Sequence, residues 1–169
     1  KSVMLDLIKE ELCASGVDGS QFIAINFENM SNTHLCTAVA LHDEIIRRAS
    51  EIKGKVYLFF DEIQEVDAWE KCINSFRVEL DCDIYITGSN AKLLSGELAT
   101  YLAGRYVAFV VYPFSFAEFI ELYHTVYPNT DNRQCFSKYL TAGGMPYLSN
   151  LRYDETASRQ YLRDLFNSV

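Results

Sequence analysis

The sequence of 169 residues contains no long apolar segment. A membrane-spanning helix needs roughly 18 or more consecutive apolar residues. The best candidate, residues 106–116, is shorter and contains Pro113. No basic segment followed by an apolar one, as in a secretory signal, stands at the amino end. We therefore expect a cytoplasmic domain without a membrane partner.

Paired cysteines are also missing. The five cysteines are odd in number and scattered, without any CxxC spacing. Such cysteines are typical of reduced thiols in a reducing compartment. The three histidines stand at no metal-ligand spacing with them, so we expect no structural zinc site.

The third absence is a basic stripe. The formal net charge is −8, and Arg47-Arg48 is the only adjacent pair among the 15 basic residues. Proteins that bind nucleic acid non-specifically concentrate positive charge to neutralise phosphates. Nucleic acid is therefore expected as a partner only through a further domain outside this sequence.

Apolar strand patterns alternate with helical patterns, which predicts an α/β fold with a parallel sheet. The predicted strands are 21–27, 56–60, 83–87 and 106–112, and the predicted helices between them are 1–14, 34–49, 69–79 and 91–102. After Pro113 the pattern becomes helical. We predict a core at 1–112 and a helical, lid-like extension at 113–169.

The most informative segment is the apolar run 56–60, which leads directly into Asp61 and Glu62. A short apolar run rich in aromatic residues predicts a strand buried on both faces. Its carboxyl end is where open α/β sheets bind their ligands. The pattern is that of a Walker B element, in which Asp61 holds Mg²⁺ through water and Glu62 accepts a proton from an attacking water. Alternatively, the two carboxylates have no catalytic role and stand only where the side chains of the strand cease to be buried.

Lys1-Ser2 precedes an apolar helical pattern, as the last two residues of a P-loop do. In that interpretation Lys1 contacts the β- and γ-phosphates of ATP and the Ser2 hydroxyl binds Mg²⁺. The glycine-rich loop and the strand before it are not in the sequence, so we expect a fragment that lacks its P-loop strand. The alternative is an arbitrary helix start.

Two further candidates follow the strand at 83–87. Ser89 or Asn90 can orient the attacking water, because a hydroxyl or an amide offers both a donor and an acceptor; the alternative is a strand-to-helix turn with a helix cap. Arg105, just before the strand at 106–112, can act as an arginine finger on a neighbouring subunit. Alternatively, it complements a helix dipole.

Together, the runs YLFFDEIQEVDAWE, TGSNAKLLS, the Gly-Arg before a strand, and PFSFAEF resemble AAA-type P-loop ATPases of bacteria and archaea. The chain looks most like the group that usually carries a carboxyl-terminal domain of uncharacterised function. The resemblance implies ATP and Mg²⁺ as cofactors, a five-stranded sheet of order 5-1-4-3-2, ATP hydrolysis, and possible homo-oligomers. The sensor 1 position maps to Ser89 and Asn90, and the arginine position to Arg105.

Two other functions stay open at this point. One is a nucleotide-binding or protein-interaction module that does not hydrolyse ATP. The other is the ATPase part of a DNA-processing protein.

Overall fold

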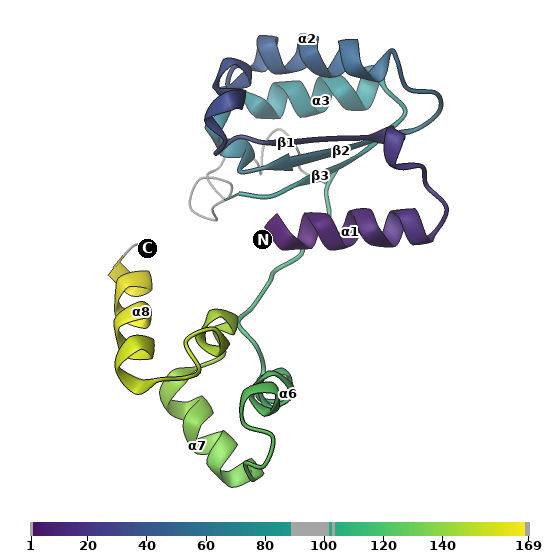
Figure 1. The fold of residues 1–169 in the computed structure, drawn as a ribbon. Coiled ribbons are helices and arrows are strands. Elements are labelled where there is room, and N and C mark those ends of the chain that lie inside the picture. The colour runs from purple at the N-terminus through teal and green to yellow at the C-terminus, as the bar shows by residue number, and fades with distance from the viewer. Residues whose placement is uncertain (1, 89–101, 103, 168–169) are drawn as a thin grey trace. The chain divides into compact units, whose positions relative to one another are not determined.

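The computed structural model describes residues 2–88, 102 and 104–167 of the chain (Figure 1). Internal contacts divide the chain into unit 1, residues 1–108, and unit 2, residues 109–169. Each unit has its own core. No helix in the described part of the chain has the length and apolar character needed to cross a membrane.

Unit 1 contains a parallel sheet of three strands in the order β1-β2-β3. The strands are β1 (Phe22–Asn26), β2 (Val56–Asp61) and β3 (Cys82–Ile86). The register aligns Asn26 with Asp61 and Phe60 with Ile86. The carboxyl ends of all three strands therefore meet at one edge of the sheet.

Helices cover both faces of this sheet (Figure 1). Helices α2 (Ala38–Ala49) and α3 (Trp69–Glu79) lie over one face, and α1 (Ser2–Ala14) lies over the other. The connections contain the short 3₁₀ helices η1 (Gly19–Gln21), η2 (Met30–Leu35) and η3 (Ile63–Glu65). The predicted α/β architecture with a parallel sheet between helices is confirmed.

The core explains why β2 is the central strand. Leu58 and Phe60 are fully buried in the cluster that includes Ile45 and Phe76 from α2 and α3. On the opposite face Phe59 is buried, with the Lys9 ammonium of α1 5.2 Å from its ring centroid. Burying each of these side chains contributes about 1.5–3 kcal/mol. Because both faces are covered, the strand is apolar at successive positions rather than at alternate ones.

The predicted helix over residues 34–49 is only partly correct. Helix α2 begins at Ala38, where the Thr37 hydroxyl accepts a hydrogen bond from the Ala40 N–H (3.3 Å). The residues before Thr37 form η2, whose amino end is capped by Asn29. Two local caps thus divide a segment in which the apolar pattern indicated one helix.

The prediction of a strand at 106–112 was wrong. This segment has no strand conformation, and its apolar side chains are exposed, with Phe109 85% exposed. A strand exists only through hydrogen bonds to a neighbour. Within the described residues, no strand of the sheet pairs with this segment. Among the described residues the sheet therefore has three strands rather than five, and the helix predicted at 91–102 lies almost wholly outside them.

Unit 2 consists of helices, as predicted for the residues after Pro113. They are α6 (Phe116–Val126), α7 (Asn132–Ala142), the 3₁₀ helix η4 (Pro146–Ser149) and α8 (Glu155–Asn167). Phe119, Leu148 and Tyr153 are the centre of its core. The division of the chain falls after Ala108, whereas the core at 1–112 and the lid-like extension at 113–169 stay predictions.

Candidate functional site

Side chains from all three strand ends converge on Asp61, the last residue of β2. Asp61 is only 6% exposed. Its Oδ2 accepts a hydrogen bond from Asn26 Nδ2 (2.9 Å) at the end of β1, and its Oδ1 accepts one from the Thr87 hydroxyl, directly after β3. A buried carboxylate needs such donors to replace lost hydration. The sheet therefore holds this carboxylate in one orientation.

Glu62 leaves the strand in an unusual backbone conformation. It lies in the left-handed region, with φ 53° and ψ 50°. Its N–H donates to Thr87 Oγ1 (3.2 Å), and its Oε2 accepts from Gln64 Nε2 (2.5 Å). A residue with a Cβ in this region costs about 1–3 kcal/mol, and such residues cluster at functional sites.

A cavity of about 410 Å³ opens beside Glu62, between the segments that follow β1 and β2. Burial, followed by the nearby charges of Glu65 and Asp67, raises the pKa of the Cys36 thiol in this cavity, so Cys36 stays a neutral thiol. The lining residues are Phe27, Glu28, Met30, Thr33, Cys36, Glu62, Gln64 and Glu65. The chemistry available in this cavity is therefore that of carboxylates.

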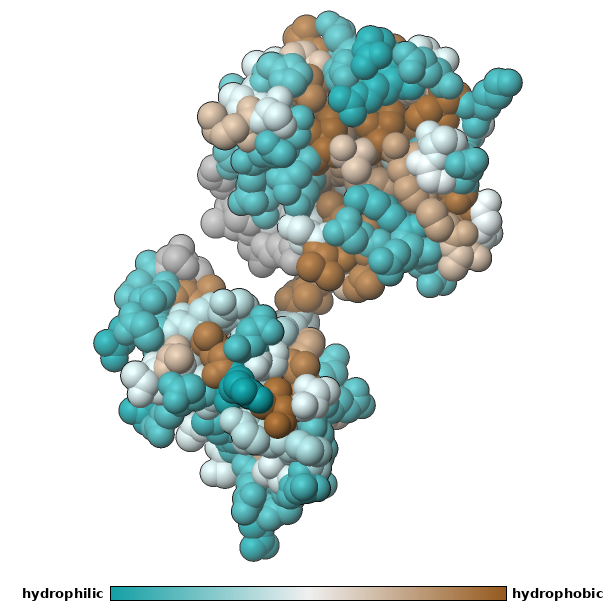
Figure 2. Space-filling model, in the orientation of Figure 1, coloured by the Kyte–Doolittle hydropathy of each residue, from teal (hydrophilic) through white to brown (hydrophobic). Residues whose placement is uncertain are grey.

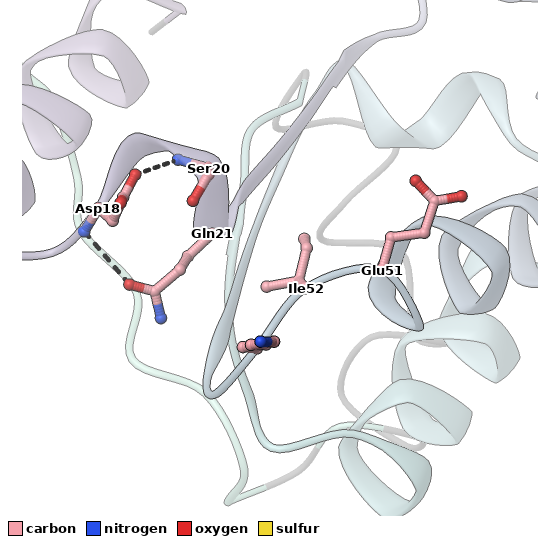
Figure 3. A pocket seen from close by; sticks show the side chains of 6 residues that line it. Asp18, Ser20, Gln21, Glu51 and Ile52 are labelled. Carbon is pink, nitrogen blue, oxygen red and sulfur yellow. Dashed lines mark hydrogen bonds between the residues drawn. The ribbon is translucent and has the colours of Figure 1, made fainter.

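A second cavity, of about 350 Å³, lies at the opposite end of the sheet, before β1 and β2 (Figure 3). Asp18 and Gln21 cap η1 there: Asp18 accepts from the Ser20 N–H (2.8 Å), and Gln21 Oε1 accepts from the Asp18 N–H (3.2 Å). The hydrogen bonds from Ser20 hold the pKa of Asp18 below its ordinary value. These polar groups serve the local turn, so we place the functional site at the carboxyl ends of the strands.

The structure brings together only some of the predicted site residues. Asp61 and Glu62 lie side by side at the predicted edge. Ser2 is exposed at the start of α1, and Figure 1 shows that α1 begins at the end of the sheet where the strands finish. Arg105 is exposed too, and its N–H donates to the Leu102 carbonyl (2.9 Å). Among the described residues, no hydrogen bond or ion pair joins Ser2 or Arg105 to the acidic pair. The other predicted site residues, which lie outside the described residues, are Lys1, Ser89 and Asn90.

Sequence reasoning missed three residues that contact the acidic pair: Asn26, Gln64 and Thr87. Two of them could have been found. Asn26 is the last polar residue of the predicted strand 21–27, and Thr87 ends the predicted strand 83–87. Because parallel strands finish at the same edge, polar residues at these positions belong beside Asp61. Gln64 depends on the turn at Glu62, for which the sequence has no glycine signal.

The oxygens of Asp61 suit Mg²⁺ held through water. Each oxygen accepts one hydrogen bond in the structure and keeps capacity for another. Mg²⁺ prefers oxygen ligands, retains several waters, and commonly uses only one or two carboxylates together with phosphates. Within the described ranges, no cluster of three or more His, Cys, Asp or Glu side chains forms a closed metal site. The donor set therefore fits a shared, partly hydrated ion.

The fold and the site define an α/β domain with a buried aspartate and a neighbouring glutamate at the carboxyl ends of parallel strands. Residues 1–120 match the family model described as AAA domain, and the chain belongs to that family. It therefore has a nucleotide-binding, ATPase-like domain.

Two curated relatives are themselves uncharacterized proteins. One, from Haemophilus influenzae, is 37% identical over 172 residues, covering 100% of this chain and 42% of the relative. The other, from Methanocaldococcus jannaschii, is 32% identical over 156 residues, covering 88% of this chain and 34% of the relative. The chain thus spans less than half the length of either relative. No solved structure matches it significantly.

Proposed function

We propose that this chain forms most of an ATP-binding and ATP-hydrolysing module. One observation carries the proposal: a buried aspartate and a strained glutamate stand together where three parallel strands of an AAA-family domain end. This is the arrangement of a Walker B element, and the family match supports it.

Each residue has a definite role in this proposal. Lys1 and Ser2 end the P-loop, where Lys1 neutralises phosphate charge. Ser2 and Asp61 hold Mg²⁺, which supplies charge stabilisation to the phosphates of ATP when bound. Glu62 accepts the proton of the attacking water.

The remaining predicted residues complete the module. Ser89 and Asn90 orient the water from which Glu62 takes a proton as that water attacks the phosphate. Arg105, which is exposed, acts on the nucleotide of a neighbouring copy, so the active form is a homo-oligomer. We expect hydrolysis to drive a carboxyl-terminal domain, in keeping with the greater length of the relatives. The scattered, unpaired cysteines support a cytoplasmic location.

The proposal includes the strand that precedes a P-loop. In the described sheet β3 has a neighbour on one side only, and all its residues are partly buried. Figure 2 shows apolar colour across unit 1 at the level of the sheet, between more hydrophilic helix surfaces. A strand preceding Lys1 would pair with the open side of β3 and supply the P-loop.

The first test is calorimetry of Mg²⁺–ATP binding by this chain and by a longer form that contains the residues preceding Lys1 in its gene. We expect tight binding by the longer form only, because P-loop backbone donors form charge-assisted hydrogen bonds worth about 1.5–3 kcal/mol each. Absence of binding by both forms would refute the proposal.

The second test is turnover by the longer form. Glu62→Gln should lower turnover about 10²–10⁴-fold while leaving ATP binding nearly intact. Glu121→Gln is the matched control, because Glu121 is an exposed carboxylate of α6 that does not line this cavity. Binding without any wild-type turnover would instead indicate a non-hydrolysing module, and stimulation of turnover by DNA would indicate a nucleic-acid-processing protein.

A further inference from the structure

Thr87 contacts three consecutive peptide units around the acidic pair. Its N–H donates to the Phe60 carbonyl (2.9 Å), and its carbonyl accepts from the Ile63 N–H (3.1 Å). Between these backbone bonds, its hydroxyl donates to Asp61 Oδ1 and accepts from the Glu62 N–H (3.2 Å). One residue therefore spans the whole turn from Phe60 to Ile63.

The hydroxyl of Thr87 is suited to this position because one oxygen both donates and accepts. Asp61 needs a donor, and the Glu62 N–H needs an acceptor. Valine has the same shape but offers neither, whereas serine retains the hydroxyl and loses only a methyl group. The threonine is also restricted at χ1, which helps to keep the oxygen between its two partners.

The contact between Thr87 and Glu62 bears on the left-handed turn. In that conformation the Glu62 N–H points to Thr87 Oγ1. A strained backbone persists only where its surroundings determine it. The Thr87 hydroxyl is the side-chain partner that holds the Glu62 backbone, and the cavity beside this turn is the one that Glu62 lines.

We propose that Thr87 is a positioning residue that sets the relative geometry of Asp61 and Glu62 for ATP hydrolysis; this inference rests on the proposed function. Through one oxygen, Thr87 orients the carboxylate that holds the metal ion and the backbone that directs the general base. Asn26 differs, because its side chain contacts Asp61 but not Glu62. Thr87 therefore couples the two members of the pair, whereas Asn26 supports only one.

The test compares Thr87→Val with Thr87→Ser in the longer, P-loop-containing form of the protein. We expect Thr87→Val to lower kcat about 10²-fold, the order of loss seen when reacting groups are misplaced by about 1 Å. It should also raise the Mg²⁺ concentration for half-maximal turnover, with a smaller change in KM for ATP. Thr87→Ser should retain most of the wild-type kcat.

Two further variants sharpen the comparison. Asn26→Ala should raise the Mg²⁺ requirement with a smaller loss of kcat, because the Glu62 backbone stays held. Thr125→Val is the matched control: Thr125 is an exposed helix residue of unit 2 whose hydroxyl donates to the Leu122 carbonyl (2.7 Å), and its replacement should change neither parameter. If Thr87→Val does not fold, Thr87→Ala is the second variant, because it removes the hydroxyl together with the γ-methyl group.

The outcomes separate this inference from the proposed function. Absence of turnover by the wild type would overturn both. Wild-type turnover together with unchanged kcat and Mg²⁺ dependence in a folded Thr87→Val or Thr87→Ala variant would overturn the inference alone. A loss of kcat in Thr87→Ser as large as in Thr87→Val would also overturn it, because the hydroxyl would then not be the active feature.

Discussion

The left-handed conformation of Glu62 makes an unusual prediction about stability. At an ordinary helix position alanine is more stable than glycine by about 1 kcal/mol. At φ 53° this order should reverse, because a Cβ in the left-handed region costs about 1–2 kcal/mol. Glycine loses about 0.5–1 kcal/mol more backbone entropy on folding. We therefore expect Glu62→Gly to be more stable than Glu62→Ala by about 0.5–1 kcal/mol.

Both variants lack the carboxylate, so the loss of the hydrogen bond to Gln64 cancels in the comparison. Ala68 provides a positive control, since its φ is 55° and no catalytic role falls on it; Ala68→Gly should stabilise by a similar amount. Lys71, exposed within α3, provides the opposite control. There the free energy of unfolding of the alanine variant should exceed that of the glycine variant by about 1 kcal/mol.

Urea denaturation followed by tryptophan fluorescence measures these differences. Trp69 is the only tryptophan, lies in unit 1 and is 5% exposed, so its emission reports the unfolding of that unit. With a urea slope of about 2 kcal/mol/M, the expected difference moves the midpoint by roughly 0.3–0.5 M. A Glu62→Ala variant more stable than Glu62→Gly would refute the argument that this residue is strained.

Two further predictions concern other parts of the chain. The hydrogen bond between His42 and Glu79 (3.0 Å) raises the pKa of His42. The stabilisation that protonated His42 contributes to the fold is therefore complete below about pH 6.5 and is lost as pH rises through the raised pKa. The melting temperature of the wild type should exceed that of His42→Asn by less at about pH 8.5 than at about pH 6; a difference that grows with pH would contradict this. A Cβ on Gly144 would lie 2.1 Å from the Phe114 carbonyl oxygen, so Gly144→Ala should destabilise unit 2 by about 1–3 kcal/mol or more. Gly19→Ala is the control, because a Cβ on Gly19 would have nothing within 4 Å and should not destabilise the protein. Thermal unfolding followed by circular dichroism measures both effects, and equal effects would contradict the contact.

Much of the fold follows from local patterns in the sequence. The apolar run 56–60 predicted the buried central strand, and the aromatic helical pattern after Pro113 predicted α6. Asp61 and Glu62 were found because the end of a buried strand is visible as the point where carboxylates replace apolar residues. The strand prediction at 106–112 failed because strand pairing requires a partner, whereas the helix predicted at 34–49 is divided by the local caps of Asn29 and Thr37.

The sequence by itself determined the class of fold and the location of the acidic pair. Both depend on local patterns, namely the spacing of apolar residues in each strand and helix and the abrupt change from apolar to charged residues after position 60. Only the tertiary structure decided how that pair is held. Asn26 and Thr87 are 35 residues before and 26 residues after Asp61, and parallel pairing of three strands brings them to its two oxygens. The left-handed turn at Glu62 has the same origin, since the Thr87 hydroxyl that accepts from the Glu62 N–H follows a different strand, β3. Contacts between distant segments arise from sheet register, which no single segment of the sequence encodes.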